Sequence, residues 1–283
     1  MKTPRLKFPP GSEWLYIKIY GGPQALEDWL INSFMRRLSV WRNSGLVKQF
    51  HFIHYIDPDY HLRLRLLLSD EIHTGTILQA IQLSCRELLD EDLIWKIEIG
   101  TYEPEYERYG VERMPIIERW FEIDSLFWLR EIEQMLVDDH DIWKRVVLSI
   151  DFLLDDFETA LDNKIQIISK LKDASGSYFS LTRSMKGQLD EKYRKLSDEV
   201  DKLLINDEEI RDESLSMRSV EAKIIINQIQ ESFESLELLF ASNLLPDLIH
   251  MSLNRAFRTK HRLQELVVYD FLGRYYESRK ARG

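Results

Sequence analysis

Along this chain of 283 residues, apolar side chains recur either at every second position or at helical spacing, and beyond the first part of the chain helical spacing predominates. Residues 14–20 alternate with a period of two, which predicts a strand that ends at Gly21-Gly22-Pro23. Residues 25–41 then carry apolar side chains at helical spacing until Asn43-Ser44-Gly45. The chain therefore opens with a strand followed by a helix.

The same strand signal recurs further on. Residues 47–55 and 61–68 read as two strands joined by the turn Asp57-Pro58-Asp59, residues 76–89 as a helix, and residues 93–99 as a fourth strand. This order is βαββαβ, which is typical of a ferredoxin-like sheet.

From about Glu112 onward strand signals fade and helical spacing takes over. No internal repeat and no Gly- or Ser-rich linker divides the chain. We therefore expect an α+β protein with a single domain over residues 1–283, in which residues 1–110 contain the sheet and residues 111–283 are mainly helical. The predicted helices of the second region are 114–136, 138–172, 177–204, 216–241 and 246–278.

Composition narrows the class of protein. Lys plus Arg number 38 against 48 Asp plus Glu, a net charge of -10, so the overall field opposes direct nucleic-acid binding. A single cysteine, Cys85, excludes an intramolecular disulfide. No signal peptide and no apolar run of about 18 residues is present, which predicts a cytoplasmic protein without a membrane span.

Common cofactor and hydrolase motifs are absent from the sequence, including the phosphate-binding Gly-x-x-x-x-Gly-Lys and the zinc-binding His-Glu-x-x-His. His51 and His54 differ in strand parity and so point to opposite faces, which argues against a metal cluster. We therefore predict neither a cofactor nor a metal.

The strongest chemical signal is Asp57-Pro58-Asp59-Tyr60-His61-Leu62-Arg63-Leu64-Arg65. Alternation along a strand places His61, Arg63 and Arg65 on one face and the leucines on the other. Such a cationic row favours an anionic partner. The alternative is an edge strand whose arginines are solvated or paired with surface acids.

Two more segments carry polar side chains of the same kind. Arg108 lies in Tyr102-Glu103-Pro104-Glu105-Tyr106-Glu107-Arg108-Tyr109-Gly110, where it either reaches the pocket of Arg63 and Arg65 or pairs with Glu105 and Glu107. In the predicted last helix, His250, Asn254, Phe257 and His261 recur at spacings of four, three and four, which predicts one stripe.

Together, in this order, the three segments resemble the elimination domain of class I lantibiotic dehydratases, which also occurs free-standing as a thiopeptide-type bacteriocin biosynthesis protein. The resemblance runs from Glu13-Trp14-Leu15-Tyr16-Ile17 to Tyr275-Tyr276-Glu277-Ser278-Arg279, and includes Ile117-Glu118-Arg119-Trp120-Phe121-Glu122-Ile123-Asp124-Ser125. One departure is Val111 after Gly110, where the family often has a second glycine.

This resemblance implies a lyase that eliminates glutamate from glutamylated Ser or Thr of a ribosomal precursor peptide, leaving dehydroalanine or dehydrobutyrine. Carried over from the family, Arg65 and Arg108 anchor the glutamyl group or stabilise the enolate, and His250 moves a proton. His61, Arg63 and Asn254 are expected to bind substrate. Which residue removes the α-proton stays open.

The implied partners are the precursor peptide and a separate glutamylating subunit that uses glutamyl-tRNA, because a chain of this length lacks the large N-terminal region of full-length dehydratases. A homodimer is left open. Two alternative functions remain: a pyridine synthase that joins two dehydroalanines in a formal [4+2] cycloaddition, and a non-catalytic subunit that binds the precursor peptide.

Overall fold

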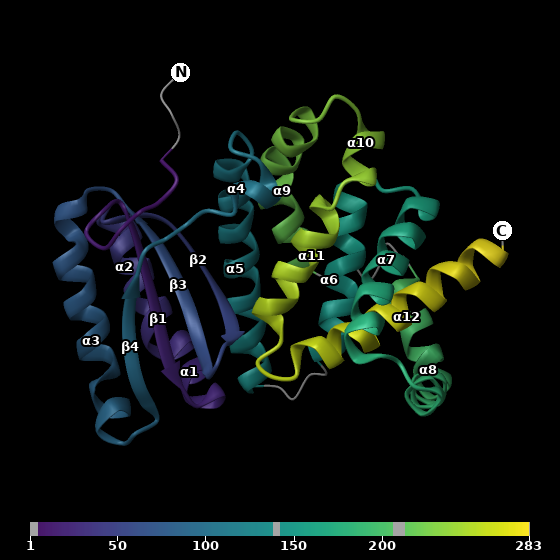
Figure 1. Cartoon of the computed structure of the whole chain (residues 1–283), viewed down its shortest axis with the longest axis horizontal. Coiled ribbons are helices and arrows are strands. Elements are labelled where there is room, and N and C mark those ends of the chain that lie inside the picture. Colours follow the sequence, from purple (N-terminus) through teal and green to yellow (C-terminus); the bar gives the residue numbers. More distant parts are fainter. Residues whose placement is uncertain (1–4, 138–141, 206–212, 283) are drawn as a thin grey trace. The chain divides into compact units, whose positions relative to one another are not determined.

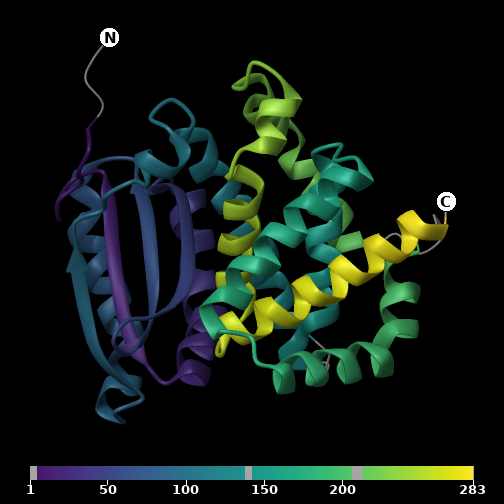
Figure 2. The same ribbon diagram turned by 45° about the vertical axis from the view of Figure 1, so that its right-hand side comes forward.

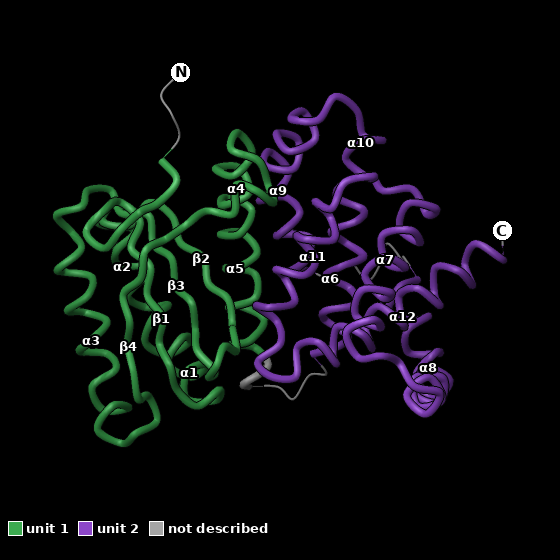
Figure 3. Tube along the Cα trace, viewed as in Figure 1, with its two compact units in different colours: residues 1–138 green, residues 139–283 purple. Residues whose placement is uncertain are grey.

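The computed structural model describes residues 5–137, 142–205 and 213–282. The chain forms two compact units, Met1–Asp138 (unit 1) and Asp139–Gly283 (unit 2), shown in different colours in Figure 3. No helix of the described ranges combines the length and the apolar character needed to cross a membrane.

Unit 1 is built on an antiparallel sheet of four strands: β1 (Trp14–Gly21), β2 (Val47–Ile56), β3 (Tyr60–Leu68) and β4 (Ile94–Gly100). All four lie within a residue or two of their predicted ranges. Their spatial order is β2-β3-β1-β4, so β3 is an interior strand. The alternative interpretation of residues 61–68 as an edge strand is therefore wrong, and the expectation of an α+β protein is confirmed.

Helices cover one face of this sheet, as Figures 1 and 2 show. They are α1 (Pro23–Trp29), η1 (Leu30–Phe34), α2 (Met35–Asn43), the short turn η2 (Glu71–His73) and α3 (Thr74–Asp90). The predicted helix at 25–41 is thus continuous but contains a π-helical turn at η1. On the face toward these helices, Leu62, Leu64 and Leu66 are completely buried, which is the physical reason for the strand's alternation.

Helix α5 (Met114–Val137) follows the four-residue helix α4 (Tyr106–Tyr109) and packs along the outer edge of β2. The backbone N–H of Phe52 donates to Ser125 Oγ at 3.3 Å, which satisfies an edge group that would otherwise lack a partner. One turn earlier on α5, Glu122 lies 3.4 Å from Arg42 of α2. Because α5 closes the sheet edge, the first compact unit extends to residue 138, beyond the sheet-containing region predicted to end at residue 110.

The described residues of unit 2 form helices joined by short turns, with no strand among them. Its helices are α6 (Ile142–Asp156), α7 (Leu161–Phe179), α8 (Arg183–Leu204), α9 (Glu213–Glu231), α10 (Leu236–Ala241), α11 (Leu244–Ala256) and α12 (His261–Arg282). Three predicted helices are each divided. The predictions 138–172 and 246–278 break at Glu158 and at Lys260, where the backbone adopts a positive φ that no α-helix contains, and residues 138–141 lie outside the described residues. The prediction 216–241 breaks between α9 and α10. All three predictions are therefore wrong as single elements.

The core of unit 2 contains a buried cation. Lys164 of α7 is 4% exposed, and its Nζ lies 2.7 Å from both Asp151 and Asp155 of α6. Tyr276 of α12 donates its hydroxyl to the same Asp151 at 2.6 Å. These contacts tie α6, α7 and α12 together, although they bury a charge that needs its partners.

Candidate functional site

The face of the sheet opposite helices α1 to α3 carries His61, Arg63 and Arg65, and is called the arginine face below. The strand register places Arg65 between Tyr16 of β1 and His51 of β2. This central position follows from the strand order, because a side chain on an interior strand is flanked on both sides.

Arg65 lies against two aromatic rings. Its guanidinium carbon is 4.9 Å from the ring centre of Tyr16 and 5.6 Å from that of Tyr102, which follows β4. Aromatic faces attract a cation without neutralising its charge. Its Nη1 is buried and has no hydrogen-bond acceptor among the described residues. Arg65 is therefore held in place and keeps a buried donor that no described acceptor satisfies.

Tyr102 also belongs to a buried pair. Its hydroxyl donates to Glu118 Oε1 of α5 at 2.5 Å, and both side chains are buried. Burial raises the pKa of Glu118 to about 7, although the Tyr102 hydrogen bond and the charge of Arg65 act in the opposite direction. Burial also raises the pKa of Tyr102 well above its ordinary value. A carboxyl group that changes protonation near neutral pH therefore lies beside the candidate site.

Arg63 is oriented by His61. Arg63 Nε donates to His61 Nε2 at 3.0 Å, and its guanidinium carbon is 3.4 Å from the ring centre of Tyr55. His61 is fully buried, stacks on Tyr20, and its Nδ1 lies 2.8 Å from the Asp59 carbonyl oxygen. With Nε2 acting as acceptor, Nδ1 carries the proton of the neutral ring. Burial, first, and the charge of Arg63 lower the pKa of His61, despite the bond to Asp59.

Arg108 lies on the short helix α4 rather than at the end of β4. Its Nη1 is 2.7 Å from Glu105 Oε2, and both side chains are partly exposed. The predicted pairing with a neighbouring acid is thus realised with Glu105. Its predicted action in the pocket of Arg63 and Arg65 stays a prediction.

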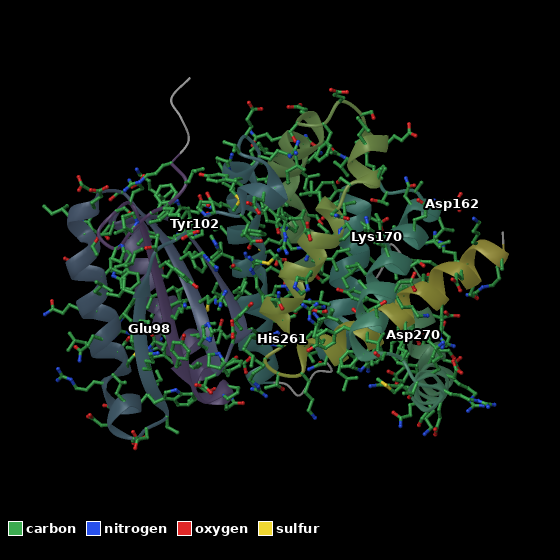
Figure 4. The ribbon with its side chains drawn as sticks, in the orientation of Figure 1. Glu98, Tyr102, Asp162, Lys170, His261 and Asp270 are labelled. Carbon is green, nitrogen blue, oxygen red and sulfur yellow. The ribbon has the colours of Figure 1, made fainter. Side chains whose placement is uncertain are left out.

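In unit 2, His250 of α11 is part of a polar cluster. Asn254 Nδ2 donates to His250 Nε2 at 3.1 Å, and His261 Nδ1 lies 3.3 Å from Asn254 Oδ1. On the other side of the ring, His250 Nδ1 lies 3.0 Å from the carboxylate of Glu265, which is 1% exposed. Asn254 therefore bridges two histidines, and Glu265 faces the first of them. Figure 4 labels His261 within unit 2.

The cluster arises differently from the predicted stripe. His250 and Asn254 share α11, as their spacing indicates, but α11 ends at Ala256 and His261 begins α12. The backbone turn at Lys260 brings His261 back to Asn254, so the contact is tertiary rather than helical. Burial lowers the pKa of His261, which favours its neutral form.

Sequence reasoning did not assign roles to Tyr16, Tyr102, Glu118 and Glu265. The register Tyr16↔Arg65 follows from the strand order, which the sequence pattern does not contain. Tyr102 and Glu118 both fall within segments that resemble the dehydratase family, which is the signal that could have drawn attention to them. No group of three or more His, Cys, Asp or Glu side chains is arranged to hold a metal ion within residues 5–137, 142–205 and 213–282.

These features occur in a chain whose residues 14–276 match the family model described as lantibiotic biosynthesis dehydratase C-term. The chain therefore belongs to that family, as the resemblance of its motifs predicted. Over 137 residues it is 28% identical to the nisin biosynthesis protein NisB of Lactococcus lactis subsp. lactis, covering 48% of this chain and 13% of NisB.

Two solved structures share the fold. The tRNA-dependent lantibiotic dehydratase MibB from Microbispora sp. 107891 superposes with a TM-score of 0.74 at 19% identity, over 100% of this chain and 29% of MibB. The pyridine synthase TbtD from thiomuracin biosynthesis superposes with a TM-score of 0.61 at 11% identity, over 96% of this chain and 100% of TbtD. The chain thus spans less than a third of NisB and MibB but the full length of TbtD.

Proposed function

We propose that this protein is the glutamate-eliminating subunit of a split peptide dehydratase. Its substrate is a ribosomal precursor peptide whose Ser or Thr side chains have been glutamylated by a separate subunit that uses glutamyl-tRNA. A base removes the α-proton of the modified residue, the Cβ–O bond breaks, glutamate leaves as a carboxylate, and the Cα=Cβ double bond of dehydroalanine or dehydrobutyrine remains.

The observation that carries this proposal is the environment of Arg65, whose buried Nη1 has no acceptor among the described residues. Elimination creates negative charge twice, on the enolate and on the leaving carboxylate, and a guanidinium fork suits both. The aromatic support from Tyr16 and Tyr102 keeps Arg65 fixed without supplying an internal counterion. In this proposal Arg65 receives the anion, Arg63 assists, and Arg108 exchanges Glu105 for the substrate.

His250 transfers a proton in the proposed reaction. Its Nδ1 lies 3.0 Å from the buried carboxylate of Glu265, and acid–base catalysts commonly pair a histidine with an acidic side chain. Asn254 holds the opposite ring nitrogen. The role of His250 is proposed from the geometry of unit 2 alone, as that of Arg65 is from unit 1.

We also propose the topology of unit 1 and the domain organisation of the chain. The antiparallel order β2-β3-β1-β4, with helices on one face, supports a ferredoxin-like topology for unit 1. The match over residues 14–276 supports one elimination-type domain built from both units.

A pyridine synthase is the second candidate, because the superposition extends over all of TbtD and nearly all of this chain. That enzyme class forms a ring from two dehydroalanines and needs no site for a departing glutamate. The cationic arginine face therefore favours elimination over cycloaddition.

Purified protein incubated with a synthetic glutamylated peptide tests the proposal directly. Loss of glutamate, followed by mass spectrometry, is the expected result. A macrocycle formed from a dehydrated peptide would instead identify a pyridine synthase, and binding without turnover would identify a peptide-binding subunit.

A further inference from the structure

Three elements of unit 1 converge beneath Arg65. Arg65 lies on β3, Tyr102 follows β4, and Glu118 lies on α5. Tyr102 touches both of the others, with its ring 5.6 Å from the guanidinium carbon and its hydroxyl 2.5 Å from the carboxyl oxygen. Tyr102 is labelled in Figure 4.

A neutral acceptor could hold the Tyr102 hydroxyl equally well, and its burial would not require the desolvation of a charge. Burial of a carboxyl group at this position therefore lowers stability, which indicates that the carboxyl has another role. The position of Glu118 differs from that of Glu122, one turn later on the same helix. Glu122 is partly buried, and its carboxyl group lies 3.4 Å from Arg42 of α2. The charge of Glu118 acts on Tyr102, and the charge of Arg65 acts on both Tyr102 and Glu118.

We propose that Glu118 and Tyr102 are positioning residues for Arg65: Glu118 fixes the Tyr102 ring under the guanidinium, and its charge regulates how strongly Arg65 attracts an anionic ligand. This inference rests on the proposed function, in which Arg65 receives a carboxylate. Neither residue touches the substrate in this scheme.

The regulation follows from charge alone. An ionised Glu118 offsets part of the positive charge of Arg65 and so weakens its attraction for an anionic ligand, whereas a protonated Glu118 leaves that attraction at full strength. Other ionisable groups also surround this pair. Tyr106 and Glu105 border Tyr102 or Glu118, and the ring centres of His51 and Tyr16 lie 6.2 Å and 6.5 Å from that of Tyr102.

Since the pKa of Glu118 is about 7, its protonation state changes within the working range of most enzymes. An anion bound at Arg65 opposes ionisation of Glu118, so binding is accompanied by proton uptake. Affinity for the anion therefore falls as pH rises through about 7.

The test measures inhibition of elimination by free L-glutamate, the anionic product, at about pH 6 and about pH 8. L-Glutamate keeps the same net charge across this interval, so its own titration does not contribute. For the wild type we expect inhibition to weaken by about two- to fivefold at the higher pH, which corresponds to a pKa change of Glu118 of about half a unit to one unit.

Glu118→Gln separates charge from position. The amide oxygen still accepts from Tyr102, so we expect inhibition at the higher pH to approach its strength at the lower pH. Glu118→Ala loses the hydrogen bond as well and should weaken inhibition at both pH values by about fivefold or more. Glu122→Gln, which replaces a partly buried carboxyl on the same helix that faces Arg42, is the matched control and should retain the pH dependence of the wild type.

A Glu118→Gln variant with the pH dependence of the wild type, or a wild type that L-glutamate does not inhibit, overturns the inference. Arg65→Ala distinguishes this failure from failure of the proposed function. If Arg65→Ala stops elimination while Glu118→Gln behaves as wild type, only the role of Glu118 is wrong. If Arg65→Ala eliminates normally, the proposed function is wrong as well.

Discussion

Replacing Arg65 tests the arginine face most directly. In Arg65→Ala the two N–H donors that would hold a carboxylate are lost, and each charge-assisted hydrogen bond contributes about 1.5–3 kcal/mol. Two such bonds in the transition state correspond to about 3 kcal/mol or more, so the elimination rate should fall by about 100-fold or more. Arg65→Lys keeps the charge but not the fork, and should lose less.

The fold should survive this substitution. Arg65 makes cation–π contacts with Tyr16 and Tyr102, each contributing about 0.5–1 kcal/mol, while its buried Nη1 has no acceptor among the described residues and is costly to keep. The two effects oppose each other. Thermal unfolding of the variant should therefore stay close to that of the wild type, which shows that any loss of rate is chemical.

The assay is single-turnover elimination from a synthetic glutamylated peptide, with the glutamylated and dehydrated forms quantified by mass spectrometry. Arg37→Ala is the control, because Arg37 donates to the Ser33 carbonyl of its own helical segment and lies away from the arginine face. A fall of less than about tenfold, or about 1.4 kcal/mol, in folded Arg65→Ala would remove Arg65 from the charge-stabilising role.

Three further outcomes are expected. In the same single-turnover assay, His250→Phe should slow elimination by about 10²–10⁴-fold, and an unchanged rate would refute the role of His250. His261 contacts His250 only through the side chain of Asn254, so His261→Ala should have a milder effect. Burial lowers the pKa of His61 in the folded protein below 6.5, so the unfolded chain binds the proton more readily and the free energy of unfolding falls as pH drops below 6.5. In urea unfolding, His61→Gln should lose less of this free energy at low pH than the wild type. Equal losses would contradict the role of His61 as neutral acceptor for Arg63. Lys164→Met leaves its buried aspartate partner without a cation and should lower the free energy of unfolding by about 3–5 kcal/mol in urea, with a loss under about 1 kcal/mol contradicting the buried pair.

Local sequence signals determined the elements and the composition of the arginine face. Strand alternation separated His61, Arg63 and Arg65 from the three leucines, because side chains on a strand point to opposite faces whatever lies around it. Those leucines are buried because they are apolar and occupy alternate positions, which places them on one face of the strand. Helical spacing likewise placed His250 and Asn254 on one face of α11.

The tertiary structure decided which groups these side chains meet. Tyr16 lies beside Arg65 only because β1 pairs with β3, and Glu118 reaches Tyr102 only because α5 closes the edge of β2. His261 returns to Asn254 because the chain turns at Lys260. Such contacts join residues far apart in the chain, and their energies depend on burial and on the packing of whole elements, which no local pattern of apolar and polar positions encodes.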